Sequence, residues 1–127
     1  MYTAIIKKGM GKGALFIPHY QEKIKLLIHW TPYPGTLNCI LDKKEQKQYN
    51  QAKTKAKSFV IPEFQHLQKS FGKVTLIPIN IPSIPNAAII IPEKTTHAES
   101  VVEIIADKNI MQALQNKEGD TITFAFR

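Results

Sequence analysis

The stretch KVTLIPINIPSIPNAAIIIP, residues 73–92, is the strongest indication of the fold of this chain. Its β-branched residues are typical of strands, and its prolines interrupt them, so residues 73–81 and 87–91 are each predicted to form a strand. Pro78 falls inside the first run and cannot donate to a sheet ladder. We therefore expect a sheet edge or a bulge at this proline.

Segments on both sides of this stretch have the same character. We predict extended segments at residues 3–7, 14–17, 36–41, 59–61 and 121–126, of which the second ends at Pro18. Residues 101–106 fit either a strand or the start of a helix. Because there are many short strands, we expect a sheet whose strands are joined by many turns.

Two helices and a polar excursion are predicted between these strands. In residues 19–29 the apolar side chains recur at helical spacing. Residues 107–115 suit a short helix with Asp107 as its N-cap. The side chains that this helix buries are predicted to be Ile110, Met111 and Leu114. Residues 42–58 are polar and suggest a long excursion with a short helix. Many short strands with few helices predict a mainly β fold, a small closed β-barrel with a few short helices.

The composition bounds the class of protein. A chain of 127 residues with 43% hydrophobic residues fits one globular domain over residues 1–127 and excludes a two-lobed kinase. The longest aliphatic run, residues 87–91, is far shorter than the ~20 residues of a membrane span. Residues 4–8 do not resemble a signal peptide, so we expect a cytoplasmic protein without membrane contacts. Cys39 is the only cysteine, which excludes disulfides within the chain.

The charge is basic, with 17 Lys and Arg residues against 10 acidic ones and a net charge of +7. Such a field attracts phosphates. However, Arg127 is the only arginine, whereas proteins that read bases rely on bidentate arginine. The densest basic group is either a solvated face or a surface for polyanions; it comprises Lys43, Lys44, Lys47, Lys53, Lys55 and Lys57.

Three of the six glycines lie within five residues, at Gly9, Gly11 and Gly13. Clustered glycines let backbone N–H groups converge on an anion, and Lys12 adds a positive charge. The spacing is not that of a Walker A loop, and the extended segment expected after it argues against a dinucleotide-binding fingerprint. A structural turn and a phosphate-binding loop both account for the cluster.

Two further groups carry candidate chemistry. In the predicted strand 36–41, Thr36 and Asn38 share one face, and two neutral oxygens suit magnesium once phosphates supply negative charge. An exposed strand face is the alternative. Glu103 lies among aliphatic residues and either faces water or hydrogen-bonds a substrate and accepts its proton. The polar loop at residues 92–97, which contains His97, is a natural rim for a site.

Taken in order, these motifs resemble the archaeal-type CTP-dependent riboflavin kinases. The matching segments are residues 9–13 (GMGKG), 34–38 (PGTLN), 92–97 (PEKTTH), 103–106 (EIIA) and 119–120 (GD). The resemblance covers residues 5–42 and 74–126, which leaves the lysine-rich middle outside it. It implies a closed six-stranded barrel of the cradle-loop type that transfers the γ-phosphate of CTP to the 5′-hydroxyl of riboflavin, giving FMN and CDP.

The resemblance also implies roles for individual residues. Nucleotide-binding residues would be Gly9, Met10, Gly11, Lys12, Gly13 and Ala14, with a second segment at Lys108, Asn109, Ile110 and Met111. Magnesium ligands would be Thr36 and Asn38. Flavin contacts would fall on Thr95 and Glu103, with Glu103 as the catalytic residue. The partners implied are CTP and riboflavin, with Mg²⁺ as cofactor. We expect a monomer that binds no nucleic acid.

The chain departs from the family pattern at two places. Ala14 stands where a basic residue is expected, and residues 108–111 lack an arginine. Lys12 and Lys108 are candidates for supplying that charge. Two other functions stay open at this stage: a DNA-binding β-barrel regulator, and a flavin- or nucleotide-binding module without catalysis.

Overall fold

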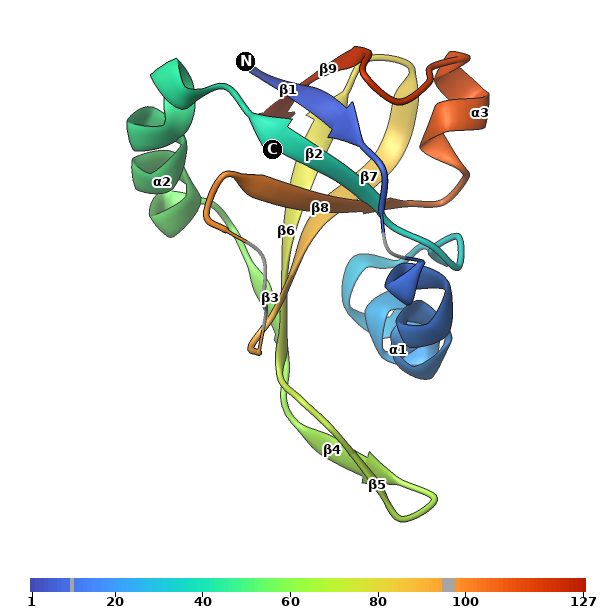
Figure 1. Cartoon of the computed structure of the whole chain (residues 1–127). Helices are drawn as coiled ribbons and strands as arrows, with labels where there is room; N and C mark the ends of the chain where they lie inside the picture. The colour runs from blue at the N-terminus through green and yellow to red at the C-terminus, as the bar shows by residue number, and fades with distance from the viewer. Residues whose placement is uncertain (10, 95–97) are drawn as a thin grey trace.

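The computed structural model of the chain describes residues 1–9, 11–94 and 98–127 (Figure 1). In chain order its elements are β1 (Tyr2–Lys7), α1 (Lys12–Ile28), β2 (Leu37–Leu41), the 3-10 helix η1 (Lys43–Glu45), α2 (Gln46–Lys55), β3 (Phe59–Ile61), β4 (Phe64–His66), β5 (Lys69–Phe71), β6 (Val74–Ile81), β7 (Ile84–Pro92), β8 (Val101–Ala106), α3 (Ile110–Leu114) and β9 (Thr121–Phe126).

Six antiparallel strands close into a barrel in the order β6-β7-β8-β2-β1-β9, because β9 pairs with β6 as well as with β1. The short strand β3 extends the sheet from β6, and β4 and β5 form a separate two-stranded hairpin that projects from the barrel (Figure 1). The predicted mainly β, closed six-stranded barrel is therefore confirmed. Residues 101–106, for which the sequence left two alternatives, form a strand between β2 and β7.

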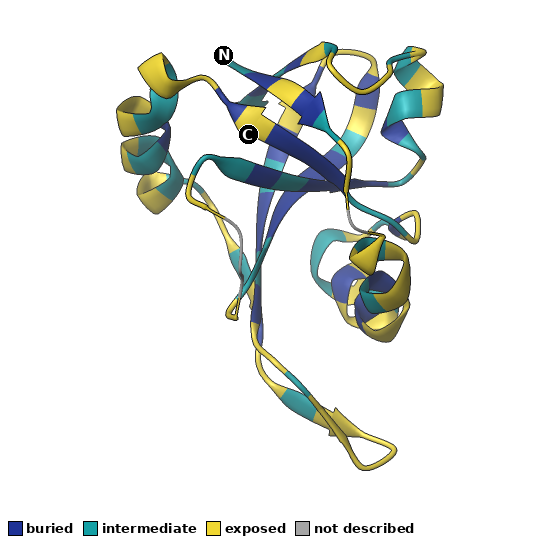
Figure 2. Ribbon diagram, viewed as in Figure 1, coloured by how far each residue is buried: buried dark blue, intermediate teal, exposed yellow. Residues whose placement is uncertain are grey.

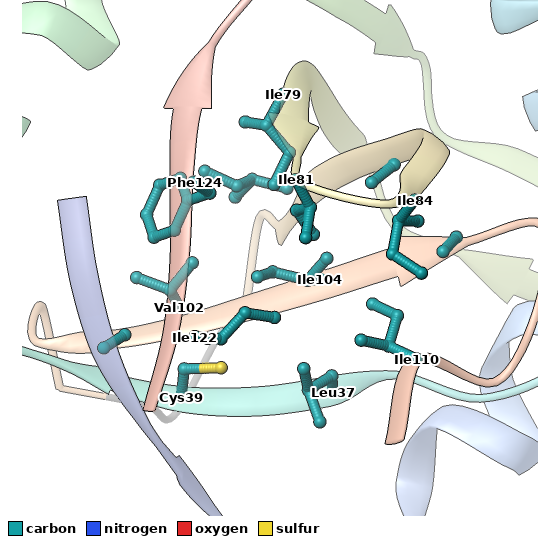
Figure 3. Close-up of a cluster of buried hydrophobic side chains, with 14 of the residues drawn as sticks. Leu37, Cys39, Ile79, Ile81, Ile84, Val102, Ile104, Ile110, Ile122 and Phe124 are labelled. Carbon is teal, nitrogen blue, oxygen red and sulfur yellow. The ribbon is translucent and has the colours of Figure 1, made fainter. Parts of the chain in front are cut away.

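The barrel interior is filled by side chains from every strand of the ring. Leu37, Cys39, Ile104 and Phe124 are among its buried members, and Figure 3 shows them gathered between the strands. The residues in alternate positions face the outside, as in β2, where Ile40 is exposed between two buried neighbours. The burial map of Figure 2 shows the same alternation of dark and light bands along the barrel strands.

Helix α1 covers the outer face of the barrel and corrects two sequence predictions. Ile17, Tyr20 and Ile24 are buried against β6, β7 and β8. The segment 14–17, predicted to be extended, is helical, and Pro18 lies inside the helix. Proline removes one helical hydrogen bond and normally breaks a helix, but here the apolar face packs on the sheet on both sides of it. The glycine cluster is therefore followed directly by a helix.

Pro78 lies in the interior of β6 without breaking the sheet. Its partner on one side is Ala88 of β7. On the other side, pairing with β3 ends at Leu76 and pairing with β9 begins at Ile79. The proline thus occupies the gap between two partners, and the register shifts between Ile79 and Ile81, which confirms the predicted irregularity.

The smaller helices differ in detail from the predictions. Helix α3 starts later than expected, and Asn109 rather than Asp107 is its N-cap, because the Asn109 side chain accepts from the backbone N–H of Gln112. Ile110 is buried as predicted, whereas Met111 and Leu114 are half-buried against the core. Asp107 instead accepts a hydrogen bond from Asn86. In the described part of the chain, no helix is both long and apolar enough to cross a membrane.

Candidate functional site

Two segments far apart in the sequence meet above the start of β2. The glycine cluster follows β1, and Thr36 and Asn38 lie at the beginning of β2, which pairs with β1. A Cβ atom on Gly9 would lie 2.5 Å from Nδ2 of Asn38, so any larger residue there would force the Asn38 side chain to move. Gly13 lies equally close to Thr36. The structure thus brings the predicted phosphate loop and the predicted metal ligands together.

A cavity of about 330 Å³ opens between these segments and α3. Among its lining residues are the predicted metal ligands Thr36 and Asn38. It is also lined by eight of the residues predicted to bind nucleotide: Gly9, Gly11, Gly13, Ala14, Lys108, Asn109, Ile110 and Met111. Lys12 is exposed at the first position of α1, and Met10 lies outside the described residues. We refer to this space as the glycine-loop cavity.

The N-terminus of α1 contributes to the electrostatics of the glycine-loop cavity. Gly11 is the N-cap in a left-handed conformation, no side chain caps the helix, and its first turn contains no acidic residue. Gly13 and Ala14 of this turn line the cavity, so unpaired backbone N–H groups and the helix dipole favour an anion there. Lys108 adds a cationic side chain from the opposite wall. The cavity suits a phosphate group.

The oxygens beside this cavity fit a hard cation. Asn38 is buried, and its Oδ1 atom has no hydrogen-bond partner among the described residues. A buried polar oxygen without a partner is costly unless a ligand satisfies it. Residues 1–9, 11–94 and 98–127 contain no cluster of three or more acidic, histidine or cysteine side chains. Asn38 and Thr36 therefore fit Mg²⁺ only together with a ligand that brings negative charge.

Glu103 lies directly opposite Asn38 in the pairing of β8 with β2. Side chains of directly paired residues project from the same face of a sheet, so both lie on the outer face of the barrel. Glu103 is half-buried and lines a second cavity, which it shares with Tyr49 and Lys53 of α2. Glu103 thus stands between the glycine-loop cavity and this second cavity. Thr95, the other predicted flavin contact, and His97 of the predicted rim loop lie outside the described residues.

Cys39 adjoins Asn38 in the chain but takes no part in this site. Its side chain is fully buried inside the barrel, and burial raises the pKa of its thiol to about 12. A thiol with a raised pKa is a poor nucleophile. The chemistry of the site therefore lies on the outer face of β2.

Tyr33 and Lys53 line the two cavities and were not identified as site residues from the sequence. Tyr33 lines the glycine-loop cavity, and its hydroxyl oxygen accepts a 3.4 Å hydrogen bond from Asn109. Its position in the Pro-Tyr-Pro-Gly turn just before Thr36 was the available signal. Lys53 lines the second cavity, and nothing in the sequence distinguishes it from the lysines around it.

Comparisons of the sequence with known proteins agree on one family. The model of the family CTP-dep_RFKase, described as "Domain of unknown function DUF120", matches residues 6–125. The riboflavin kinase of Sulfurisphaera tokodaii is 36% identical over 119 residues, which are 92% of this chain and 88% of that protein. The riboflavin kinase of Methanobrevibacter smithii is 32% identical over 95% of both chains. That of Saccharolobus solfataricus is 32% identical over 93% of this chain and 69% of its own length.

Proposed function

Since the chain belongs to the riboflavin kinase family, we propose that it transfers the γ-phosphate of CTP to the 5′-hydroxyl of riboflavin, giving FMN and CDP. The observation that carries this proposal is the pairing of Asn38 with Glu103 across β2 and β8. This pairing puts Asn38, a proposed ligand of the metal that binds the phosphates, next to Glu103, a carboxylate suited to accept the proton of the hydroxyl.

On the phosphate side, the glycine-loop cavity would hold the nucleotide. The N–H groups at the start of α1 and of the preceding loop would bind the β- and γ-phosphates. Lys108 lines the same cavity. Lys12, the first residue of α1, stands in the sequence between Gly11 and Gly13, which also line it. Both lysines would take the place of the basic residue that is missing at Ala14. CTP as the donor rests on the resemblance of the sequence motifs.

The metal ligands in this proposal are Oδ1 of Asn38 and Oγ1 of Thr36. The buried Asn38 Oδ1 atom, unpartnered in the described part of the chain, supports this role. These two side chains would hold Mg²⁺, which would supply positive charge for the transferred phosphoryl group. Phosphoryl transfer depends mainly on such positioning and charge neutralisation, so the site needs no nucleophilic side chain.

On the acceptor side, Glu103 would orient the 5′-hydroxyl of riboflavin and accept its proton as the oxygen attacks the γ-phosphorus. The P–O bond to the β-phosphate oxygen breaks, and CDP leaves with both electrons of that bond. Thr95, predicted as a second flavin contact, precedes β8 in the chain. The half-buried position of Glu103, beside Asn38, supports its role as the acceptor-side residue.

The test is to incubate the protein with riboflavin, magnesium and each of the four nucleoside triphosphates, and to separate the products by chromatography. We expect FMN and the matching diphosphate in equal amounts, with CTP as the best donor. Flavin and nucleotide binding without FMN would indicate a binding module that has lost catalysis. Salt-dependent DNA binding without binding of either small molecule would indicate a regulator instead.

A further inference from the structure

The lysine-rich segment that lies outside the resemblance contains one lysine unlike the others. Lys53 is half-buried, whereas the other five lysines of this group are exposed: Lys43, Lys44, Lys47, Lys55 and Lys57. The group therefore lies on an exposed face, except at Lys53. A lysine can bury its aliphatic stem while its ammonium stays accessible, so the groups around Lys53 decide what its ammonium can bind.

Helix α2 is held in one position beside the barrel, which fixes where Lys53 lies. Tyr49 is buried in the barrel core, where its ring packs edge-on against Tyr2 and Phe124. Gln46 donates to the backbone carbonyl of Glu99, just before β8, and Figure 1 shows α2 beside the beginning of that strand. Lys53 follows Tyr49 by one helical turn and so projects from the same face.

Lys53 lines the second cavity together with Tyr49. Its Nζ atom lies 5.4 Å from the centre of the Tyr49 ring. Within residues 1–9, 11–94 and 98–127, Lys53 makes no hydrogen bond or ion pair. The cavity thus contains a hydrogen-bond donor that the described side chains do not use. A ligand with an acceptor would satisfy it.

The remaining walls of this cavity are largely apolar and lie where two strands separate. β7 and β8 are paired from Ala87 to Ile89 on β7, and beyond that point the strands diverge, as Figure 1 shows. The cavity lies in this fork and is lined by Ile91, Pro92 and Val101, among others. Glu99 and Glu103 also line the cavity. Aliphatic walls with a cationic donor and carboxylate acceptors at their rim suit a planar aromatic ring that carries carbonyl and N–H groups.

We propose that Lys53 determines specificity for the flavin ring, by donating a hydrogen bond to a carbonyl oxygen on the pyrimidine edge of riboflavin bound in the fork between β7 and β8. This inference rests on riboflavin being the substrate. The ring would lie on the side of Glu103 away from the glycine-loop cavity, with the ribityl chain passing Glu103 toward the phosphates. The cavity takes one end of the tricyclic ring, and the other end projects from it.

The test compares K53M with K55M, which removes the same charge from an exposed position on the same helix. Dissociation constants are measured by flavin fluorescence for riboflavin and for lumiflavin, which has the ring without the ribityl chain. We expect K53M to weaken both by about tenfold or more, the worth of a hydrogen bond to a charged donor. K55M and the nucleotide affinity of both variants should match the parent protein, and K53R should restore part of the flavin affinity.

Other results would contradict either this inference or the proposed kinase activity. If K53M binds both flavins like the parent protein, or loses nucleotide affinity equally, Lys53 does not contact the ring. If the parent protein forms FMN and K53M has unchanged flavin affinity, only this inference fails. If flavin binding depends on Lys53 and no triphosphate yields FMN, the proposed kinase activity fails and the ring site stands.

Discussion

Gly13 and Thr36 touch at the point where α1 begins beside β2. A Cβ atom on Gly13 would lie 2.6 Å from Oγ1 of Thr36 and 2.7 Å from its backbone nitrogen. Because the second of these atoms belongs to the backbone, a side-chain rotation cannot relieve the contact. The start of α1 and the proposed metal ligand are therefore fixed relative to each other.

The variant G13A should separate α1 from β2 and destabilise the fold by about 1–3 kcal/mol. It should also weaken nucleotide binding, because the N–H groups of the first turn move with the helix. G72A is the matched control, since an added Cβ there meets nothing within 4 Å. Denaturant unfolding and nucleotide titration of both variants measure the two effects. Equal behaviour of G13A and G72A would contradict the close contact.

The variant N38L should separate metal binding from stability. Leucine fills a similar volume and removes an oxygen that lacks a partner among the described residues, so the free energy of unfolding should stay the same or rise. The magnesium concentration for half-maximal activity should increase by about tenfold or more. Calorimetric titration of nucleotide with and without magnesium gives a second readout. An unchanged magnesium dependence would remove Asn38 from the ligand set.

The variant E103Q should lower kcat by about 10²–10⁴, the range for loss of a general base. Glutamine keeps the size of the side chain and one oxygen acceptor, so the nucleotide dissociation constant should stay close to that of the parent protein. Steady-state kinetics and nucleotide titration test this pair of expectations. Equal losses in kcat and nucleotide affinity would assign Glu103 a role in binding rather than in proton transfer.

Alkaline pH should destabilise the fold. Burial raises the pKa of the Cys39 thiol from 9.0 to about 12, and burial also raises the pKa of Tyr20 and of Tyr49. The unfolded chain therefore loses these protons first, and the free energy of unfolding falls as the pH rises above 9.0 toward 12.

Urea denaturation on both sides of pH 9.0 measures this fall. In C39A the decline should begin at higher pH, where the tyrosines ionise. A free energy of unfolding that does not change over this range would mean that these groups ionise as easily in the folded protein as in the unfolded chain.

Most strands could be predicted from residue patterns, because alternation of apolar and polar residues is a local property. Residues 121–126 were predicted as a strand and form β9. Helix α1 was predicted only from residue 19 onward, since Pro18 was expected to end an extended segment. Its helical start depends on Ile17 packing against the barrel, and a contact between distant segments outweighs a local preference.

The ordered motifs determined on their own which segments carry the candidate site and to which family the chain belongs. Only the three-dimensional fold brings Gly9 to Asn38, sets Asn38 opposite Glu103, and leaves Lys53 half-buried while the other lysines of its group are exposed. These contacts join residues far apart in the chain, and strand register and helix packing create them. The lysines of this group cannot be told apart in the sequence, because only the packing of α2 on the barrel defines which side of that helix faces inward.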